Sequence, residues 1–162
     1  MPVTNSGKAV VTLPADDQIL IEREFDAPAA LVWRALTEPE LVKRWWAGRR
    51  GEVTSVEIDL RVGGAWRYVM SAHGGAFEVA FHGEYREIVP GERIVSTEVF
   101  EGFPDAASVN TMTLVERDGR TTLRTLVQHS SKEHRDGHVD SGMEGGLQES
   151  FDALEDVAKS LA

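Results

Sequence analysis

The fold of this chain is decided between residues 18 and 46, which read QILIEREFDAPAALVWRALTEPELVKRWW. Residues 18–25 alternate apolar and charged side chains with a period of two, which predicts a β-strand with one buried face. Apolar residues within 29–36 recur at helical spacing, and those within 41–46 resume that spacing after Pro39. The segment therefore predicts a strand followed by two short helices.

The helix starts carry recognisable signals. Asp26 is expected to cap the first helix, with Pro28 in its first turn, where a missing N–H costs nothing. Thr37 and Glu40 have the three-residue spacing of a capping box, in which each side chain satisfies a free backbone N–H. Such a box predicts that the second helix begins at Thr37.

Downstream, the pattern changes to strands and then to one long helix. Between residues 53 and 129, apolar alternation is broken at regular intervals by glycine and proline, which is typical of an antiparallel meander. Asp118-Gly119 separates two of these runs and predicts a type I′ hairpin. A final helix is expected from about Gly142 to Leu161, with Ser141 and Glu144 as a second capping box.

These elements predict an α+β domain in which a curved antiparallel sheet of about six to seven strands wraps on the C-terminal helix. The apolar stripe of that helix matches the one uncovered face of the sheet, and the short helix pair closes one end. We expect residues 1–16 to form an arm that is partly disordered and residues 17–162 to form a single domain.

Composition excludes several classes of function. The 162 residues include 27 Asp and Glu against 17 Lys and Arg, a net charge of −10, so neither nucleic acid nor an anionic lipid surface is an expected partner. The chain contains no cysteine, which removes disulfides, thiolate nucleophiles and thiolate-bound metals. No leader-like or membrane-spanning apolar run is present, so we expect a cytoplasmic protein without membrane insertion.

The chain resembles the START-like (SRPBCC, helix-grip, birch-pollen-allergen-like) superfamily. Within it, the chain is most similar to bacterial homologues of the C-terminal domain of the heat-shock-chaperone ATPase activator. The resemblance is carried, in order, by Phe25-Asp26-Ala27-Pro28 with Val32-Trp33, Thr37-Glu38-Pro39, Leu41, Trp45-Trp46, Gly63-Gly64-Ala65-Trp66, Gly83-Glu84-Tyr85-Arg86-Glu87-Ile88, Pro90-Gly91-Glu92-Arg93-Ile94-Val95, Gly142-Met143-Glu144, Gln148-Glu149-Ser150-Phe151 and Leu154.

The resemblance implies a helix-grip fold over roughly residues 17–161, with a cavity for a small, largely apolar molecule. It also raises co-chaperone activity. The eukaryotic activator carries a separate N-terminal chaperone-binding domain, and the 16 residues before the first strand cannot encode one. A chaperone partner is therefore not expected.

Aromatic and flexible apolar side chains are the candidates for lining such a cavity. Trp66, Tyr68 and Met70 share one strand face, a combination that suits adaptable apolar binding. Gly145 and Gly146 interrupt the C-terminal helix, where a ligand would have access to its backbone. The full set of predicted ligand-binding residues is Trp33, Trp46, Trp66, Tyr68, Met70, Phe81, Met112, Met143, Leu147 and Phe151.

Two other classes of function stay open. An enzyme, cyclase-like or hydrolase-like, would use His82, His129 or an inward-facing Glu as a general acid or base, but no catalytic residue is singled out. An interaction protein would be either a chaperone regulator or a homodimer. Sequence motifs for phosphate, dinucleotide and catalytic-serine sites are absent, and no cofactor is predicted.

Charged residues outside the expected core suggest solvent-exposed surfaces. His134 and His138 have a metal-ligand spacing, but the segment around them is so polar that we predict a solvated loop and no metal site. Most of the charged residues on the strands are expected to point outward; these are Glu22, Arg23, Glu78, Glu84 and Arg86.

Overall fold

The computed structural model describes residues 8–48, 51–72 and 75–162. Within these ranges the strands are β1 (Val10–Thr12), β2 (Gln18–Phe25), β3 (Gly51–Ile58), β4 (Ala65–Ala72), β5 (Phe77–Val89), β6 (Arg93–Phe100), β7 (Ser108–Arg117) and β8 (Arg120–His129). The helices are α1 (Ala29–Thr37), α2 (Pro39–Val42), α3 (Lys132–Asp140) and α4 (Met143–Ser160).

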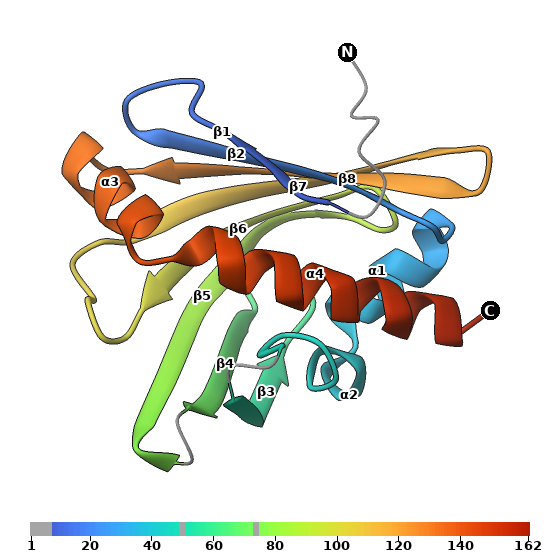
Figure 1. The fold of residues 1–162 in the computed structure, drawn as a ribbon, viewed down its shortest axis with the longest axis horizontal. Coiled ribbons are helices and arrows are strands. Elements are labelled where there is room, and N and C mark those ends of the chain that lie inside the picture. Colours follow the sequence, from blue (N-terminus) through green and yellow to red (C-terminus); the bar gives the residue numbers. More distant parts are fainter. Residues whose placement is uncertain (1–7, 49–50, 73–74) are drawn as a thin grey trace.

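One antiparallel sheet curves around α4, with α1 and α2 beneath one end (Figure 1). Its strand order is β1-β2-β8-β7-β6-β5-β4-β3, so the N-terminal strand β2 pairs with the C-terminal strand β8. The predicted helix-grip architecture is confirmed. Across the described ranges the sheet has eight strands rather than six to seven, because Val10–Thr12 of the expected arm pair with β2.

The predicted hairpin at residues 118–119 is confirmed. Asp118 and Gly119 both have positive φ, 54° and 77°, as a type I′ turn requires. The turn sets the register in which Arg117 faces Arg120, and that register continues along the whole of β7 and β8. The local turn thereby determines which side chains of both strands face α4.

Most of the apolar core lies between the sheet and α4. Phe25, Val32 and Leu154 are almost completely buried, and they bring together β2, α1 and α4. Trp45, at the end of the α2 region, donates its indole N–H to the carbonyl of Ala35 at 2.7 Å. In the described ranges, no helix is both long and apolar enough to span a membrane.

The expected helix caps are wrong. Thr37 lies in the last turn of α1, where its hydroxyl donates to the carbonyl of Trp33 at 2.7 Å, and Glu38 precedes α2. Pro28 itself is the N-cap of α1. Gly142 takes the N-cap of α4 with φ of 82°, because α3 ends immediately before it and the chain must reverse there.

The loop expected around residues 131–140 is also wrong, because the segment forms α3. Ser131 caps the helix by accepting the N–H of His134 at 3.1 Å, and Lys132 pairs with Asp136 one turn later at 2.6 Å. Arg135 is buried and donates to the carbonyl of Ala15 at 3.0 Å. These polar contacts attach α3 to the domain, although this helix has no apolar stripe.

Candidate functional site

The face of the sheet that α4 covers is the concave face, and the opposite face is the convex face (Figure 1). Because side chains along a strand point alternately to the two faces, each strand residue can be assigned to the concave or the convex face. Trp66 of β4, Tyr85 of β5 and Ile94 of β6 belong to one buried cluster, so side chains two residues away on the same strands also face α4.

Four aromatic rings form an aromatic cluster at the concave face: Trp66, Tyr68 and Phe81 from β4 and β5, and Trp46 from the turn after α2. The Trp46 ring lies edge-on to Tyr68 at 5.4 Å and to Phe81 at 5.6 Å between centroids. Trp66 and Tyr68 pack at 4.9 Å. Trp46 is fixed to α4, because its carbonyl accepts the hydroxyl of Ser150 at 2.7 Å. The cluster therefore connects the sheet to the helix.

Gly83 makes room for Trp66. A Cβ at Gly83 would lie 2.6 Å from the indole nitrogen of Trp66 and 1.8 Å from the carbonyl oxygen of Thr97. Only glycine allows the indole to lie flat against the sheet at this point. The Trp66 N–H is buried and has no hydrogen-bond partner among the described residues.

Next to the aromatic cluster lies a polar group of residues on β6 and β7, here called the polar end: Ser96, Glu98, Ser108 and Asn110. In the β6–β7 register Glu98 faces Ser108 and Ser96 faces Asn110. The Ser108 hydroxyl donates to the amide oxygen of Asn110 at 3.4 Å, and the Asn110 side chain also hydrogen-bonds Glu98. Asn110 therefore presents its amide N–H to the Glu98 carboxylate.

The polar end has an unusual electrostatic setting. Burial raises the pKa of Glu98, and the hydrogen bond from Asn110 only partly offsets that shift. Burial also raises the pKa of Tyr68, with further contributions from Tyr85 and from the charge on Glu98. The β5–β6 register places Glu98 level with Gly83, against which the Trp66 indole packs, so the carboxylate lies beside the aromatic cluster.

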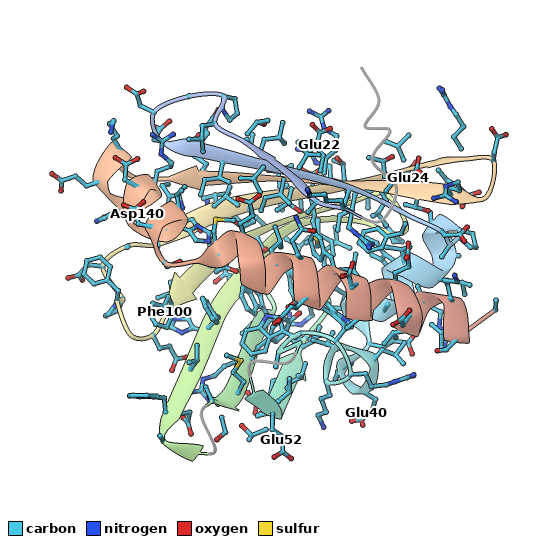
Figure 2. The ribbon with its side chains drawn as sticks, viewed as in Figure 1. Glu22, Glu24, Glu40, Glu52, Phe100 and Asp140 are labelled. Carbon is cyan, nitrogen blue, oxygen red and sulfur yellow. The ribbon has the colours of Figure 1, made fainter. Side chains whose placement is uncertain are left out.

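Packing beneath α4 does not fully exclude solvent from this part of the concave face. Ser96, Glu98 and Asn110 are all half-buried, although they point toward the covered side. Phe100 lies next to Phe81 on the same face, with their ring centroids 5.1 Å apart, and it is 41% exposed to solvent. Figure 2 shows Phe100 at the end of β6, beside the loop that leads to β7. The aromatic surface therefore runs from beneath the helix out to solvent.

Two surface clefts lie away from the concave face. One of about 360 Å³ lies between α2 and β3, lined by Lys43, Arg44, Trp45, Ala47, Gly48, Gly51, Glu52 and Val53. The other, of about 340 Å³, runs along the convex face and is lined by Pro14, Gln18, Leu20, Thr111, Thr113, Arg124 and Leu126. Both are open and contain none of the predicted ligand-binding residues, so they do not compete with the concave face as the candidate site.

Residues 26–159 match the protein family described as Activator of Hsp90 ATPase homolog 1-like protein, AHSA1. The chain belongs to this family. The match spans β3 to β8, the helices and both parts of the candidate site, whereas β1 and β2 precede it. No curated protein matches this AHSA1-like chain.

Solved structures of bacterial proteins share the fold over nearly their whole length. A protein from Rhodobacter sphaeroides is 22% identical with a TM-score of 0.87, covering 94% of this chain and 99% of its own. One from Nitrosomonas europaea is 26% identical with a TM-score of 0.82, covering 92% and 98%. One from Mycobacterium smegmatis is 25% identical with a TM-score of 0.79, covering 95% and 97%.

The structure of this AHSA1-like chain brings together part of the predicted ligand-binding set. Trp46, Trp66, Tyr68 and Phe81 form the aromatic cluster, and Trp33 and Met112 pack against the residues around Trp66. Met143 and Leu147 are partly buried on α4, against the main core.

Two other members of the predicted set belong to other cores. Phe151 packs edge-on to Phe25 at 5.6 Å in the main core, and Met70 is buried with Ala47 and Ala72 in a small core against which Trp46 of the aromatic cluster packs. At Gly145 a Cβ would meet no atom within 4 Å, so the packing of the protein itself does not require glycine there.

The candidate histidines occupy different surroundings. His82 is on the convex face, where its Nδ1 lies 2.9 Å from Glu101, and Arg67 makes two further hydrogen bonds to that carboxylate. Those two partners hold the pKa of Glu101 at about 2, the hydrogen bond from Arg67 contributing most. His82 therefore does not face the candidate site.

The buried His129 pairs with the half-buried His138, with Nε2 of His129 3.0 Å from Nδ1 of His138. His134, in contrast, bonds the hydroxyl of Ser130 at 2.8 Å, so it does not join His138 as a second ligand. Within the described ranges, no group of three or more His, Asp or Glu residues is arranged to hold a metal ion.

The histidine pair predicts a pH dependence of stability. Burial, and then the charge of His129, lowers the pKa of His138 to about 4, and burial also lowers the pKa of His129. The unfolded chain, with ordinary histidine pKa values of about 6.5, binds protons that the folded state excludes. Stability is therefore complete above about pH 6.5 and is lost as pH falls toward 4.

The variant His138→Gln should show a smaller loss of unfolding free energy than the unmodified protein between pH 7 and pH 4.5, measured by urea denaturation. Its stability at pH 8, where both histidines are neutral, separates this effect from lost packing. An equal loss in both proteins would show that the pair does not carry the pH dependence.

Two charged residues of the concave face escaped the sequence prediction. Arg23 was expected to point outward but is 1% exposed, and its guanidinium pairs with Asp152 at 2.8 Å and Glu155 at 3.7 Å on α4. Its strand position offers a signal, because it alternates with Ile21 and Phe25, which face the core. Its neighbours Glu22 and Glu24 point to the convex side (Figure 2).

Glu98 is the second missed residue. The apolar side chains of its strand fall on both faces: Val95 and Val99 on the convex face, and Ile94 and Phe100 on the concave face with Ser96 and Glu98. Hydrophobicity on this strand therefore does not assign Glu98 to a face, and only the pairing with β5 and β7 does.

Proposed function

We propose that this protein binds a small, largely apolar molecule on its concave face, between the aromatic cluster and α4. The observation that carries the proposal is an aromatic surface, beneath a covering helix, that borders half-buried polar side chains. Ligand sites are typically apolar and aromatic, with a few polar groups that fix the orientation of the ligand.

The geometry supports an elongated ligand. The apolar body would lie against Trp46, Tyr68 and Phe81, and a polar group would reach the hydrogen-bonding side chains of the polar end. The ring of Phe100, which packs on Phe81 and is exposed at the end of β6, suggests that side as the route to solvent.

A space-filling substitution tests the proposal without removing core residues. Ser96→Leu places extra methyl groups in this half-buried region, at a cost typical of overpacking, about 1–3 kcal/mol. We expect it to abolish the binding of the neutral apolar dye Nile red, whose fluorescence rises in an apolar site. It should also remove any adduct that native mass spectrometry finds on protein isolated from its host.

Val95→Leu is the matched control, because it adds a methylene to the neighbouring residue on the convex face. It should bind as the unmodified protein does, and circular dichroism should show the same fold for both variants. Equal dye binding by the Ser96→Leu variant would place the site elsewhere. Absence of both dye binding and adduct in the unmodified protein would contradict the proposed function.

A further inference from the structure

Glu98 is a carboxylate on the concave face with no ion-pair partner among the described residues. The buried guanidinium of Arg23, on the same face, is compensated in contrast by Asp152 and Glu155 within 4 Å. Glu98 has only the neutral amide of Asn110, which in turn is held by Ser108 at 3.4 Å. Even a half-buried charge that lacks a countercharge is costly, so this arrangement requires an explanation.

The surroundings of Glu98 favour a cation. The π-faces of tryptophan and tyrosine carry partial negative charge and attract ammonium groups within about 6 Å of the ring. On β6, Glu98 lies between Ser96, which faces Tyr85, and Phe100, which faces Phe81, so it is level with Gly83 and the Trp66 indole that packs there. The Tyr68 ring contacts both Trp46 and Trp66. A carboxylate and several aromatic rings therefore converge on one region, and both stabilise positive charge.

Asn110 prepares the carboxylate for this role. Because the Asn110 oxygen accepts from Ser108, its N–H groups are directed at Glu98, and this hydrogen bond favours the ionised form. The carboxylate is thereby oriented, while its remaining lone pairs stay free for a ligand N–H. Such a partly satisfied anion is suited to a cationic ligand that completes its hydrogen bonds.

We infer that Glu98 recognises a positively charged group, so that the ligand class is a small organic amine with an apolar or aromatic body. This inference rests on the proposed function, because it assigns the polar half of the same site. The ammonium group binds between Glu98 and the ring of Tyr68, and the apolar body packs on Trp46 and Phe81.

The test compares matched pairs of probes that differ only in charge. Primary amines with straight-chain or phenyl-substituted bodies of four to ten carbons, such as 4-phenylbutylamine, are each paired with the alcohol of the same length. Dissociation constants are measured by displacement of Nile red. We expect the best amines to bind the unmodified protein at least 10-fold more tightly than their alcohols.

The variant Glu98→Gln keeps the size and hydrogen-bonding capacity of the side chain but removes its charge. It should weaken amine binding at least 10-fold and change alcohol binding less than threefold, so the alcohols also show that the site is still folded. Glu84→Gln, an exposed position on the convex face of β5, is the control and should leave both unchanged.

The outcomes separate the two proposals. If alcohols bind as tightly as amines, or if Glu98→Gln leaves amine binding unchanged, the amine specificity is wrong and the apolar site stands. If neither Nile red nor any probe binds the unmodified protein, the proposed function fails and the amine specificity fails with it.

Discussion

Replacing Leu154 by alanine should lower the free energy of unfolding by about 2–5 kcal/mol. Leu154 is fully buried at the centre of α4 and packs in the core that joins the helix to β2 and α1. Truncation removes buried methyl groups and leaves a cavity that close-packed neighbours fill only in part. Urea denaturation followed by circular dichroism measures the change.

Leu13→Ala is the matched control for this substitution. Leu13 is 50% exposed, so the same chemical change should alter the unfolding free energy by no more than about 0.5 kcal/mol. Similar losses at both positions would mean that α4 does not provide the main cover of the sheet.

The double variant Asp152→Asn/Glu155→Gln should cost about 3 kcal/mol, because it leaves the guanidinium of Arg23 buried without a countercharge. This is the lower end of the range for a broken buried pair, since Asp152 is largely exposed and amide oxygens still accept hydrogen bonds. Thermal and urea unfolding monitored by tryptophan fluorescence would measure the loss.

Arg23→Met should behave differently, changing stability by no more than about 1 kcal/mol, because an apolar side chain of similar volume needs no countercharge. Two guanidinium nitrogens, Nε and Nη1, already lack hydrogen-bond partners among the described residues, which reduces what Arg23 contributes. Asp156→Asn, an exposed change on the same helix, is the control. A loss for Arg23→Met as large as that of the double variant would show that the ion pair itself stabilises the fold.

Sequence reasoning succeeded where local signals and tertiary packing agree. The alternation of β2, the two-residue turn at Asp118-Gly119 and the apolar stripe of α4 each predicted the observed element. It failed for α3, whose attachment depends on the buried Arg135 and the cap at Ser131 rather than on apolar periodicity. Helix ends were also misplaced, since Gly142 and Glu38 replace the expected capping residues.

The candidate site could be predicted only in part, for a related reason. Large aromatic side chains such as Trp66 and Tyr68 signal an apolar surface in any context. The polar end gives no such signal, because Ser96 and Glu98 resemble solvent-facing residues until β7 is placed beside them. Contacts between strands therefore decide which charged groups enter the site.

The pairing of β2 with β8 also has a consequence for the order in which the molecule assembles. It joins residues about one hundred positions apart, since Gln18 faces Gln128 and Phe25 faces Thr121. Closing so long a loop costs conformational entropy before any core contact has formed to offset that cost. Topologies rich in such distant contacts therefore fold slowly, typically over milliseconds to seconds. Until β8 and α4 have been synthesised, the apolar side of β2 stays uncovered. We therefore expect the domain to close in a late step, after its final helix is available.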